Sequence, residues 1–351
     1  MDETGYTVKP LMFTAAFNQG LPYCMNPHFK DIVVASTHAK AISSEQVIQH
    51  LWSDYGKIIK VGLSEAAVPS AILKYISLPD EINHPQGWDT ILSHARKIKS
   101  YDVEIHWYQQ WSTRCPPACR VATCFIASSD EHEHVIVLED LDAAGFPLRK
   151  SNLSKAEAKA CLKWLANFHA TFLNEAPDGL WEVGSYWHLD TRPDELEAME
   201  ESDLKKCAHA IDKALNQCKY KTVIHGDAKV ANFCFSSDGQ HVAAVDFQYV
   251  GGGCGMKDVA YFLGSCLSEQ QCDQWHAELL DDYFNELETA LDGLDKCVDW
   301  DELRKEWEEM FPVAWADFHR FLLGWMPTHH KVNVFSERMA ARAVGLFQER
   351  E

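Results

Sequence analysis

One short stretch of the chain holds the residue types that phosphate transfer to an alcohol requires. Asp227 follows a short apolar run, Asn232 comes five positions later, and Asp246 follows a second apolar run. Such a transfer needs a carboxylate that accepts the proton of the attacking hydroxyl, and hard oxygen ligands for a magnesium ion bound to the nucleotide phosphates. We therefore predict Asp227 as the base and Asn232 and Asp246 as metal ligands. Lys229, two residues after the base, would contact the transferred phosphate as a positive charge.

The elements around these residues are predicted to bring them together. Two short apolar runs flank residues 236–240, which contain the dipeptide Asp-Gly. This arrangement is typical of a β-hairpin. A hairpin at this place sets Asn232, just before the first strand, close to Asp246, just after the second. Asp227 lies on the loop directly upstream.

These residues resemble the aminoglycoside phosphotransferase and choline kinase family, and within it the ecdysteroid-kinase-like branch. The resemblance rests on His-Gly-Asp at 225–227, on Asn232, and on Asp-Phe-Gln at 246–248. Gln248 favours this branch, because relatives in the wider family more often have an acidic residue there. The resemblance implies an α+β, two-lobed, protein-kinase-like fold that binds ATP and Mg²⁺. Its smaller lobe is an antiparallel sheet with one helix, and its larger lobe is mainly helical.

The resemblance extends upstream and downstream of the catalytic stretch. Lys74, on an apolar strand, looks like the lysine that holds the α- and β-phosphates, and Glu104 looks like its partner on a helix. Glu139 and Leu141 look like the hinge against which adenine binds through backbone groups. Asp258 is similar to the aspartate that braces the catalytic loop.

A turn over residues 53–56 is the candidate for the segment that covers the nucleotide phosphates, with Gly56 as a binding residue. It has a single glycine where protein kinases have several. Asp54 in this turn would repel a triphosphate unless its side chain points away. The identity of the phosphate-covering loop, and ATP against GTP preference, therefore stay open.

The remaining pattern predicts a sheet followed by helices. We expect an N-terminal extension of unknown role (1–41), a nucleotide-binding lobe (42–138) and a catalytic lobe with the acceptor pocket (139–351). Ser154 and Glu157 form a capping box at the start of a helix. The spacing of apolar residues predicts further elements: strands at 47–52, 57–63, 71–76, 119–125 and 135–138, and helices at 88–111, 268–287 and 299–325. Pro312 is expected to break the last helix, and the glycine-rich segment 251–255 is expected to be a mobile loop.

Composition limits the partners and the compartment. The 351 residues, 46% of them hydrophobic, suffice for two lobes. The 52 acidic and 32 basic residues give a formal net charge of −20, which repels nucleic acid. No apolar run is long enough to span a bilayer, and the twelve cysteines lack the spacing of a secreted disulfide scaffold. We expect a cytoplasmic protein without a membrane span, which acts on a small-molecule alcohol; its oligomeric state is open.

Two other functions stay open. One is a choline- or aminoglycoside-type kinase with a cationic acceptor, and the other is a catalytically silent, kinase-like binding protein, suggested by the glycine-poor turn. A protein kinase is disfavoured, because Gly226 replaces the arginine of His-Arg-Asp and no Ala-Pro-Glu segment follows Asp246. The acidic composition disfavours an anionic acceptor. We rank an apolar alcohol first, because Gln248 removes one acidic side chain beside the metal site and the resemblance implies such an acceptor.

Overall fold

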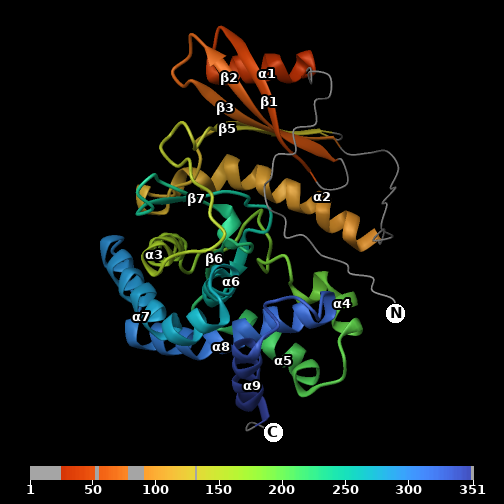
Figure 1. Ribbon diagram of the computed structural model, residues 1–351, viewed down its shortest axis with the longest axis vertical. Coiled ribbons are helices and arrows are strands. Elements are labelled where there is room, and N and C mark those ends of the chain that lie inside the picture. Colours follow the sequence, from red (N-terminus) through yellow and green to blue (C-terminus); the bar gives the residue numbers. More distant parts are fainter. Residues whose placement is uncertain (1–24, 52–54, 78–90, 131–132, 349–351) are drawn as a thin grey trace, which may run out of the picture.

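The computed structural model describes residues 25–51, 55–77, 91–130 and 133–348. Figure 1 shows two parts, a β-sheet at the top of the view and a larger, mainly helical part below it, with helix α2 running between them. This is the predicted α+β, two-lobed architecture. We call the two parts the sheet lobe and the helical lobe. The division of the chain at residues 42 and 139 stays a prediction.

The sheet lobe has five antiparallel strands in the order β1-β2-β3-β5-β4. Their bounds are β1 (Ala41–His50), β2 (Gly56–Ser64), β3 (Ser70–Ser77), β4 (Cys124–Ser129) and β5 (Glu133–Glu139). Strands β2, β3 and β5 closely match the prediction. The strand expected at 47–52 begins earlier, at Ala41, and ends at His50, and the strand expected at 119–125 begins at Cys124 and runs to Ser129. Helix α1 (Pro27–Thr37), which the sequence pattern did not predict, packs Phe29 and Val33 into the core of this sheet. Asn26 caps its first turn.

Helix α2 (Ile91–His106) continues into a single π-helical turn, Trp107–Trp111. The predicted start of this helix at Trp88 lies outside the described residues. The aromatic side chains of the π-helical turn belong to the main core of the helical lobe. The Trp107 ring stacks on Phe247 with centroids 4.5 Å apart, and Trp111 meets Phe172 edge-on at 5.6 Å. Helix α2 is therefore anchored in the larger lobe, although the sheet lies on its other side.

The helical lobe begins with α3 (Lys155–Thr171), where the predicted capping box of Ser154 and Glu157 is confirmed. Its other helices are α4 (Pro193–Ala198), α5 (Asp203–Gln217), α6 (Met256–Cys266), α7 (Glu269–Gly293), α8 (Trp300–Trp325) and α9 (Val334–Gln348). The prediction that Pro312 breaks a helix is wrong, because α8 is continuous through it. Pro312 removes one backbone hydrogen bond, but buried neighbours such as Phe311 and Val313 hold the helix in the core across that position.

Two short strand pairs frame the catalytic stretch. Strand β7 (Phe233–Phe235) pairs with β8 (Val242–Ala244), which confirms the predicted hairpin. Strand β6 (Thr222–Ile224) pairs with β9 (Gly251–Gly253), so the expectation of a mobile loop there is wrong. Glycine is needed in β9 because a neighbouring backbone lies close: a Cβ on Gly251 would stand 2.2 Å from the carbonyl oxygen of Trp181.

Within the described ranges, no helix combines the length and the apolar character needed to cross a bilayer.

Candidate active site

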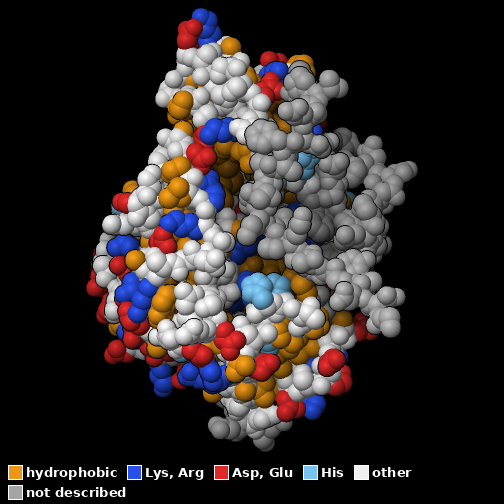
Figure 2. All heavy atoms as spheres, viewed as in Figure 1, with side chains coloured by type: hydrophobic (Ala, Val, Ile, Leu, Met, Phe, Trp, Pro, Cys, Tyr) orange, Lys and Arg blue, Asp and Glu red, His pale blue; other side chains and the backbone are white. Residues whose placement is uncertain are grey.

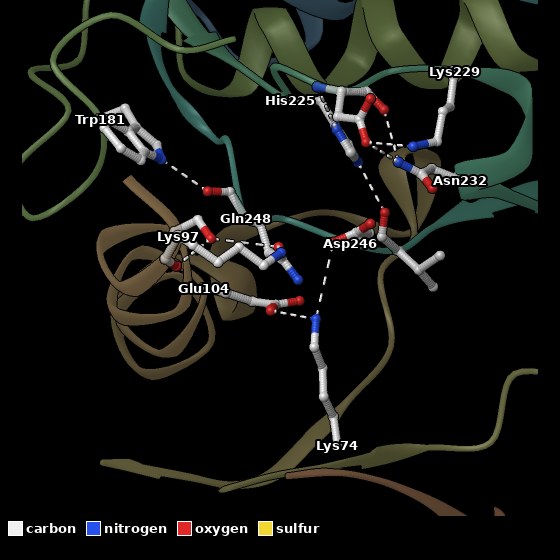
Figure 3. A network of polar contacts seen from close by, with 12 residues as sticks. Lys74, Lys97, Glu104, Trp181, His225, Lys229, Asn232, Asp246 and Gln248 are labelled. Carbon is white, nitrogen blue, oxygen red and sulfur yellow. Dashed lines mark hydrogen bonds and ion pairs between the residues drawn. The ribbon is translucent and has the colours of Figure 1, made fainter. Parts of the chain in front are cut away.

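Asp227 lies on the loop between β6 and β7, with its carboxylate held on one side only. Its Oδ2 accepts hydrogen bonds from Lys229 Nζ at 2.8 Å and from Asn232 Nδ2 at 3.1 Å (Figure 3). The other oxygen, Oδ1, is buried and has no hydrogen-bond partner among the described residues. A buried acceptor without a hydrogen-bond donor lowers the stability of the fold. Such an atom is typical of a site where a bound ligand supplies the donor.

The loop that carries Asp227 is braced by Asp258 at the start of α6. The Asp258 carboxylate accepts hydrogen bonds from the backbone N–H of His225 at 2.6 Å and from that of Gly226 at 2.9 Å. His169 Nε2 lies 3.2 Å from the same carboxylate. The predicted bracing role of Asp258 is therefore confirmed.

His225 connects the catalytic loop to the residue before Asp246. Its Nδ1 accepts from the backbone N–H of Asp227 at 3.3 Å, so the ring proton lies on Nε2, which donates to Val245 O at 3.1 Å. Both ring nitrogens are occupied and the residue is fully buried. His225 thus fixes the distance between the two aspartates of the site and is not placed to carry a proton.

Asp246 directly follows the β7–β8 hairpin and has a left-handed backbone, with φ of 70°. Its Oδ1 is buried without a hydrogen-bond partner, whereas the side chain as a whole is 38% exposed. Burial by itself would raise the pKa of Asp246, but the positive charges of Lys74, Lys229 and Lys97 lower it below its usual value. Asp246 is therefore an ionised carboxylate with an open side.

Asn232 uses its side-chain nitrogen on Asp227, which leaves the amide oxygen for a cation. A carboxylate and an amide oxygen suit magnesium. No group of three or more His, Cys, Asp or Glu side chains is arranged around a common metal position in the described part of the chain. The donor set thus fits a magnesium ion that takes its other ligands from water and phosphate, and it does not fit a metal held by protein side chains alone.

Lys74 on β3 and Glu104 on α2 form the predicted pair. Lys74 Nζ lies 2.6 Å from Glu104 Oε2 and 3.9 Å from Asp246 Oδ1. Burial raises the pKa of Glu104, and the ammonium of Lys74 opposes this shift. Burial would lower the pKa of Lys229, but Asp227 and Asp246 raise it above its usual value, so this lysine stays protonated.

The other predicted nucleotide-binding residues lie apart from this cluster. Gly56 begins β2, where a Cβ would stand 1.9 Å from Tyr75 O, so the close approach of β3 accounts for the glycine. Ser53 and Asp54 lie outside the described residues, and the role of their turn stays a prediction. Glu139 ends β5, with its side chain on Arg120 and Thr123.

At the predicted hinge, some backbone N–H and C=O groups of Glu139 and Leu141 already form hydrogen bonds with other described residues, and one does not. The Glu139 N–H already donates to Thr123 O at 2.8 Å, and Leu141 O accepts from Phe146 N at 2.8 Å. No described residue accepts from the Leu141 N–H. Of the two predicted hinge residues, Leu141 therefore keeps a free backbone donor.

Sequence reasoning missed Lys97, which lies on α2 two turns before Glu104. Lys97 Nζ donates to Gln248 Oε1 at 3.0 Å (Figure 3) and stands 4.7 Å from the centre of the Tyr101 ring. Burial and the nearby charge of Lys74 lower the pKa of Lys97 to about 8. The spacing of Lys97, Tyr101 and Glu104, four and then three residues apart, places them on one helix face and was the available signal.

Sequence reasoning also missed an aromatic wall beside the base, which we define as Tyr186, Trp187, Tyr261, Phe318 and Phe321. The hydroxyl groups of Tyr186 and Tyr261 are 3.4 Å apart. Burial raises the pKa values of both phenols, and the charge of Asp227 raises them further. No local pattern could have revealed this wall, because its members come from three distant segments.

Lys331 lies against the aromatic wall. Its Nζ stands 5.3 Å from the centre of the Tyr261 ring and 5.6 Å from that of Phe318. It has no carboxylate in ion-pair contact among the described residues, and burial lowers its pKa to about 8. Figure 2 shows apolar and basic side chains along the visible edge of the recess between the two lobes.

Comparison with protein families gives one match. The model of the ecdysteroid kinase-like family matches residues 96–177 and 181–296, which is more than half of the chain. The matched residues include Glu104, the His-Gly-Asp tripeptide, Asn232 and Asp246. No curated relative matches the chain in sequence.

Several solved structures are similar in fold. A microcompartment-associated aminopropanol kinase has 17% identity and a TM-score of 0.49, covering 90% of this chain and 95% of that chain. Choline kinase LicA from Streptococcus pneumoniae has 12% identity and a TM-score of 0.43, covering 92% and 99%. An aminoglycoside-3'-phosphotransferase of type VIII has 14% identity and a TM-score of 0.43, covering 80% and 99%.

Proposed function

The chain belongs to the ecdysteroid kinase-like family, and from this premise we propose that it transfers the γ-phosphate of ATP to a hydroxyl group of a small molecule, with magnesium as the metal. The observation that carries the proposal is the pair of buried carboxylate oxygens without partners, Asp227 Oδ1 and Asp246 Oδ1, on one hairpin-bearing segment. Neither oxygen has a hydrogen-bond donor among the described residues, and the cation near Asp246 Oδ1 is the Lys74 ammonium, 3.9 Å away. An acceptor hydroxyl and a magnesium ion supply these two missing partners.

On the nucleotide side, Lys74 would bind the α- and β-phosphates, and Glu104 keeps its ammonium in place. Asp246 and Asn232 would hold magnesium, which neutralises and orients the phosphates when it is bound. Lys229 would direct its ammonium at the transferred phosphate. The free N–H of Leu141 would donate to the adenine edge.

On the acceptor side, Asp227 acts as the base. Lys229 and Asn232 fix its Oδ2 and leave Oδ1 to accept the proton of the attacking hydroxyl. The base is thus held in one orientation before the acceptor arrives, which lowers the cost of aligning the reacting groups.

For the acceptor we propose an apolar alcohol. Most of the aromatic wall beside Asp227 is buried, so the part that an acceptor can meet is the partly buried ring of Tyr186, with the phenol hydroxyl groups of Tyr186 and Tyr261 for orientation. Lys331, which has no carboxylate partner in the described ranges, repels a cationic acceptor from the same wall. This observation favours the apolar alcohol over the choline- or aminoglycoside-type acceptor.

The experiment is an ATP-dependent phosphorylation assay with magnesium on matched sterol-like and other hydrophobic alcohols, with choline and an aminoglycoside in parallel. We expect turnover of at least one hydrophobic alcohol, detected as a mass gain of one phosphate. Asp227→Asn should lower kcat by at least about 100-fold while nucleotide affinity changes only a few fold, because the base acts in the transition state.

Three results would count against parts of the proposal. Turnover of only the cationic compounds would reverse the acceptor ranking and leave phosphate transfer intact. An Asp227→Asn variant with half of the wild-type rate would remove Asp227 as the base. Absence of any magnesium-dependent ATP consumption would support the catalytically silent binding protein.

A further inference from the structure

Lys97 is the basic residue of the site that has no assigned role. Its ammonium donates to Gln248 Oε1 at 3.0 Å, and Ser100 Oγ lies 3.5 Å from the same oxygen. Gln248 is two residues after Asp246 and is buried. Figure 3 shows the Lys97 side chain running from α2 toward the Asp246–Gln248 segment, on the same side of the site as Lys74 and Glu104.

Lys97 differs from the other two lysines of the site, Lys74 and Lys229, because each of those forms an ion pair with a carboxylate. Lys74 has Glu104 at 2.6 Å, and Lys229 has Asp227 at 2.8 Å. Lys97 is bonded to a neutral amide and has no carboxylate in ion-pair contact among the described residues. It is therefore the lysine whose positive charge no dedicated carboxylate offsets.

The identity of residue 248 preserves this charge. A glutamate at this position would place a carboxylate on the Lys97 ammonium and neutralise it. The glutamine holds the ammonium by the same geometry and leaves its charge uncompensated. An ammonium has three N–H donors, so the bond to Gln248 leaves donors for a second acceptor.

A nucleoside triphosphate is the ligand that this arrangement suits. It keeps a net negative charge after one divalent cation is bound, and the cation would use Asp246, which lies 3.9 Å from Lys74 Nζ and two residues before Gln248. The remaining phosphate charge then faces lysines. Lys74 shares its charge with Glu104, so a second lysine without a carboxylate partner adds the larger attraction.

We propose that Lys97 is a second phosphate-binding lysine of this site, held toward the β- and γ-phosphates of the nucleotide by Gln248. The inference rests on the proposed function, since it presumes that a nucleoside triphosphate binds between Lys74 and Asp246. It assigns to Gln248 a positioning role, which is to orient Lys97 without neutralising it.

The test is equilibrium binding of the ATP analogue AMP-PNP with magnesium, and separately of adenosine, to the full chain. Lys97→Met should weaken AMP-PNP binding at least about tenfold and leave adenosine binding unchanged, because only the triphosphate meets the ammonium. Lys97→Arg should retain most of the AMP-PNP affinity. Lys99→Met is the matched control, since Lys99 is an exposed lysine on the same helix that lies over the Trp181 ring.

Gln248→Glu tests the charge argument directly. It should also weaken AMP-PNP binding, because the new carboxylate offsets the Lys97 ammonium. Combining it with Lys97→Met should weaken binding further, because the carboxylate then stands unpaired beside the phosphates. Thermal unfolding of each variant shows that the fold is kept.

Two results would overturn the inference while the proposed function survives: a Lys97→Met variant with wild-type AMP-PNP affinity, or one that loses adenosine and AMP-PNP affinity equally. A wild-type chain that binds no AMP-PNP would overturn both the inference and the proposed function. A Lys99→Met variant that loses as much AMP-PNP affinity as Lys97→Met would show a general charge effect and also overturn the inference.

Discussion

At the scale of single residues, the conformation of Asp246 determines how its role can be tested. With φ of 70°, Asp246 lies in the left-handed region, which aspartate and asparagine tolerate better than other side chains except glycine. The backbone there is held by Val245, whose N–H donates to Asn232 O at 3.0 Å and whose carbonyl accepts from His225. An asparagine at 246 therefore removes the charge without adding backbone strain.

We predict that Asp246→Asn raises the magnesium concentration for half-maximal activity at least about tenfold and weakens nucleotide binding with it, because the metal carries the phosphates. The free energy of unfolding should stay close to that of the wild type. Magnesium titration of the steady-state rate and of AMP-PNP binding measures the effect. An unchanged magnesium titration would exclude Asp246 as the metal carboxylate.

The residues that sequence reasoning found and missed differ in how far apart the interacting partners lie. Asp227, Asn232 and Asp246 lie within one hairpin-bearing segment, so a fixed offset along the chain fixes their positions in space. Lys97 meets Gln248 across 151 positions. Such a pairing depends on how α2 packs against the helical lobe. The residue types Lys and Gln alone do not indicate that the two side chains meet.

At the scale of elements, the catalytic loop depends on one glycine. Gly226 has φ of +76°, and a Cβ there would stand 2.0 Å from Tyr249 O. The loop must come this close to Tyr249, because the Gly226 N–H donates to Asp258 and its carbonyl accepts from the N–H of Tyr186. An added methyl group has to push these neighbours apart.

We predict that Gly226→Ala abolishes most of the phosphotransferase activity and lowers the free energy of unfolding by about 1–3 kcal/mol or more. Gly239→Ala is the matched control: Gly239 also has a positive φ, +71°, but the atoms nearest to its Cβ would be the flexible side-chain ends of Glu157, at 3.2 Å, and Lys150, at 3.7 Å. Activity assays and denaturant unfolding compare the two. Equal activity in the two variants would contradict the proposed importance of the close approach.

Most elements could be predicted from local patterns, and the errors have a common cause. The capping box at Ser154 and the Asp-Gly hairpin are encoded by residues a few positions apart, and both are confirmed. Pro312 and the glycines of β9 suggested a break and a loop, but their structures are set by contacts from elsewhere, the surrounding core and the Trp181 backbone. Local propensity does not contain those contacts.

At the scale of the whole molecule, a fully buried charge cluster joins three parts of the helical lobe. Asp317 on α8 accepts from Arg320 at 2.8 Å and from Trp187 Nε1 at 2.9 Å, and Lys257 Nζ on α6 lies 3.5 Å away. Two cations thus share one carboxylate. Arg320 also donates to Trp187 O at 3.1 Å, so the cluster holds the aromatic wall in place.

We predict that Asp317→Asn lowers the free energy of unfolding by about 3–5 kcal/mol at pH 7, because two buried cations lose their counter-charge. Burial alone would raise the pKa of Asp317, but Arg320 and Lys257 lower it below its usual 3.8. The carboxylate therefore stabilises the fold fully above pH 3.8, and this contribution is lost as the pH falls through the lower folded-state pKa.

Denaturant unfolding at several pH values from 7 down toward 3 measures this dependence. The difference between wild type and Asp317→Asn should be constant above pH 3.8 and shrink as the pH falls below it. Asp301→Asn, on the exposed first turn of α8, is the control and should change the free energy of unfolding by less than about 0.5 kcal/mol. A difference that is the same at all pH values would show that the Asp317 charge is not its source.

Because α2 is anchored in the larger core, the Lys74–Glu104 ion pair joins the sheet lobe to the helical lobe. Lys74 moves with the sheet, most of whose buried residues form a core of their own, whereas Glu104 is fixed by α2 to the body that carries Asp227 and Asp246. A displacement of the sheet that carries Lys74 away from α2 would therefore lengthen the 2.6 Å contact between them. The length of this one contact thus depends on how the two lobes stand relative to each other.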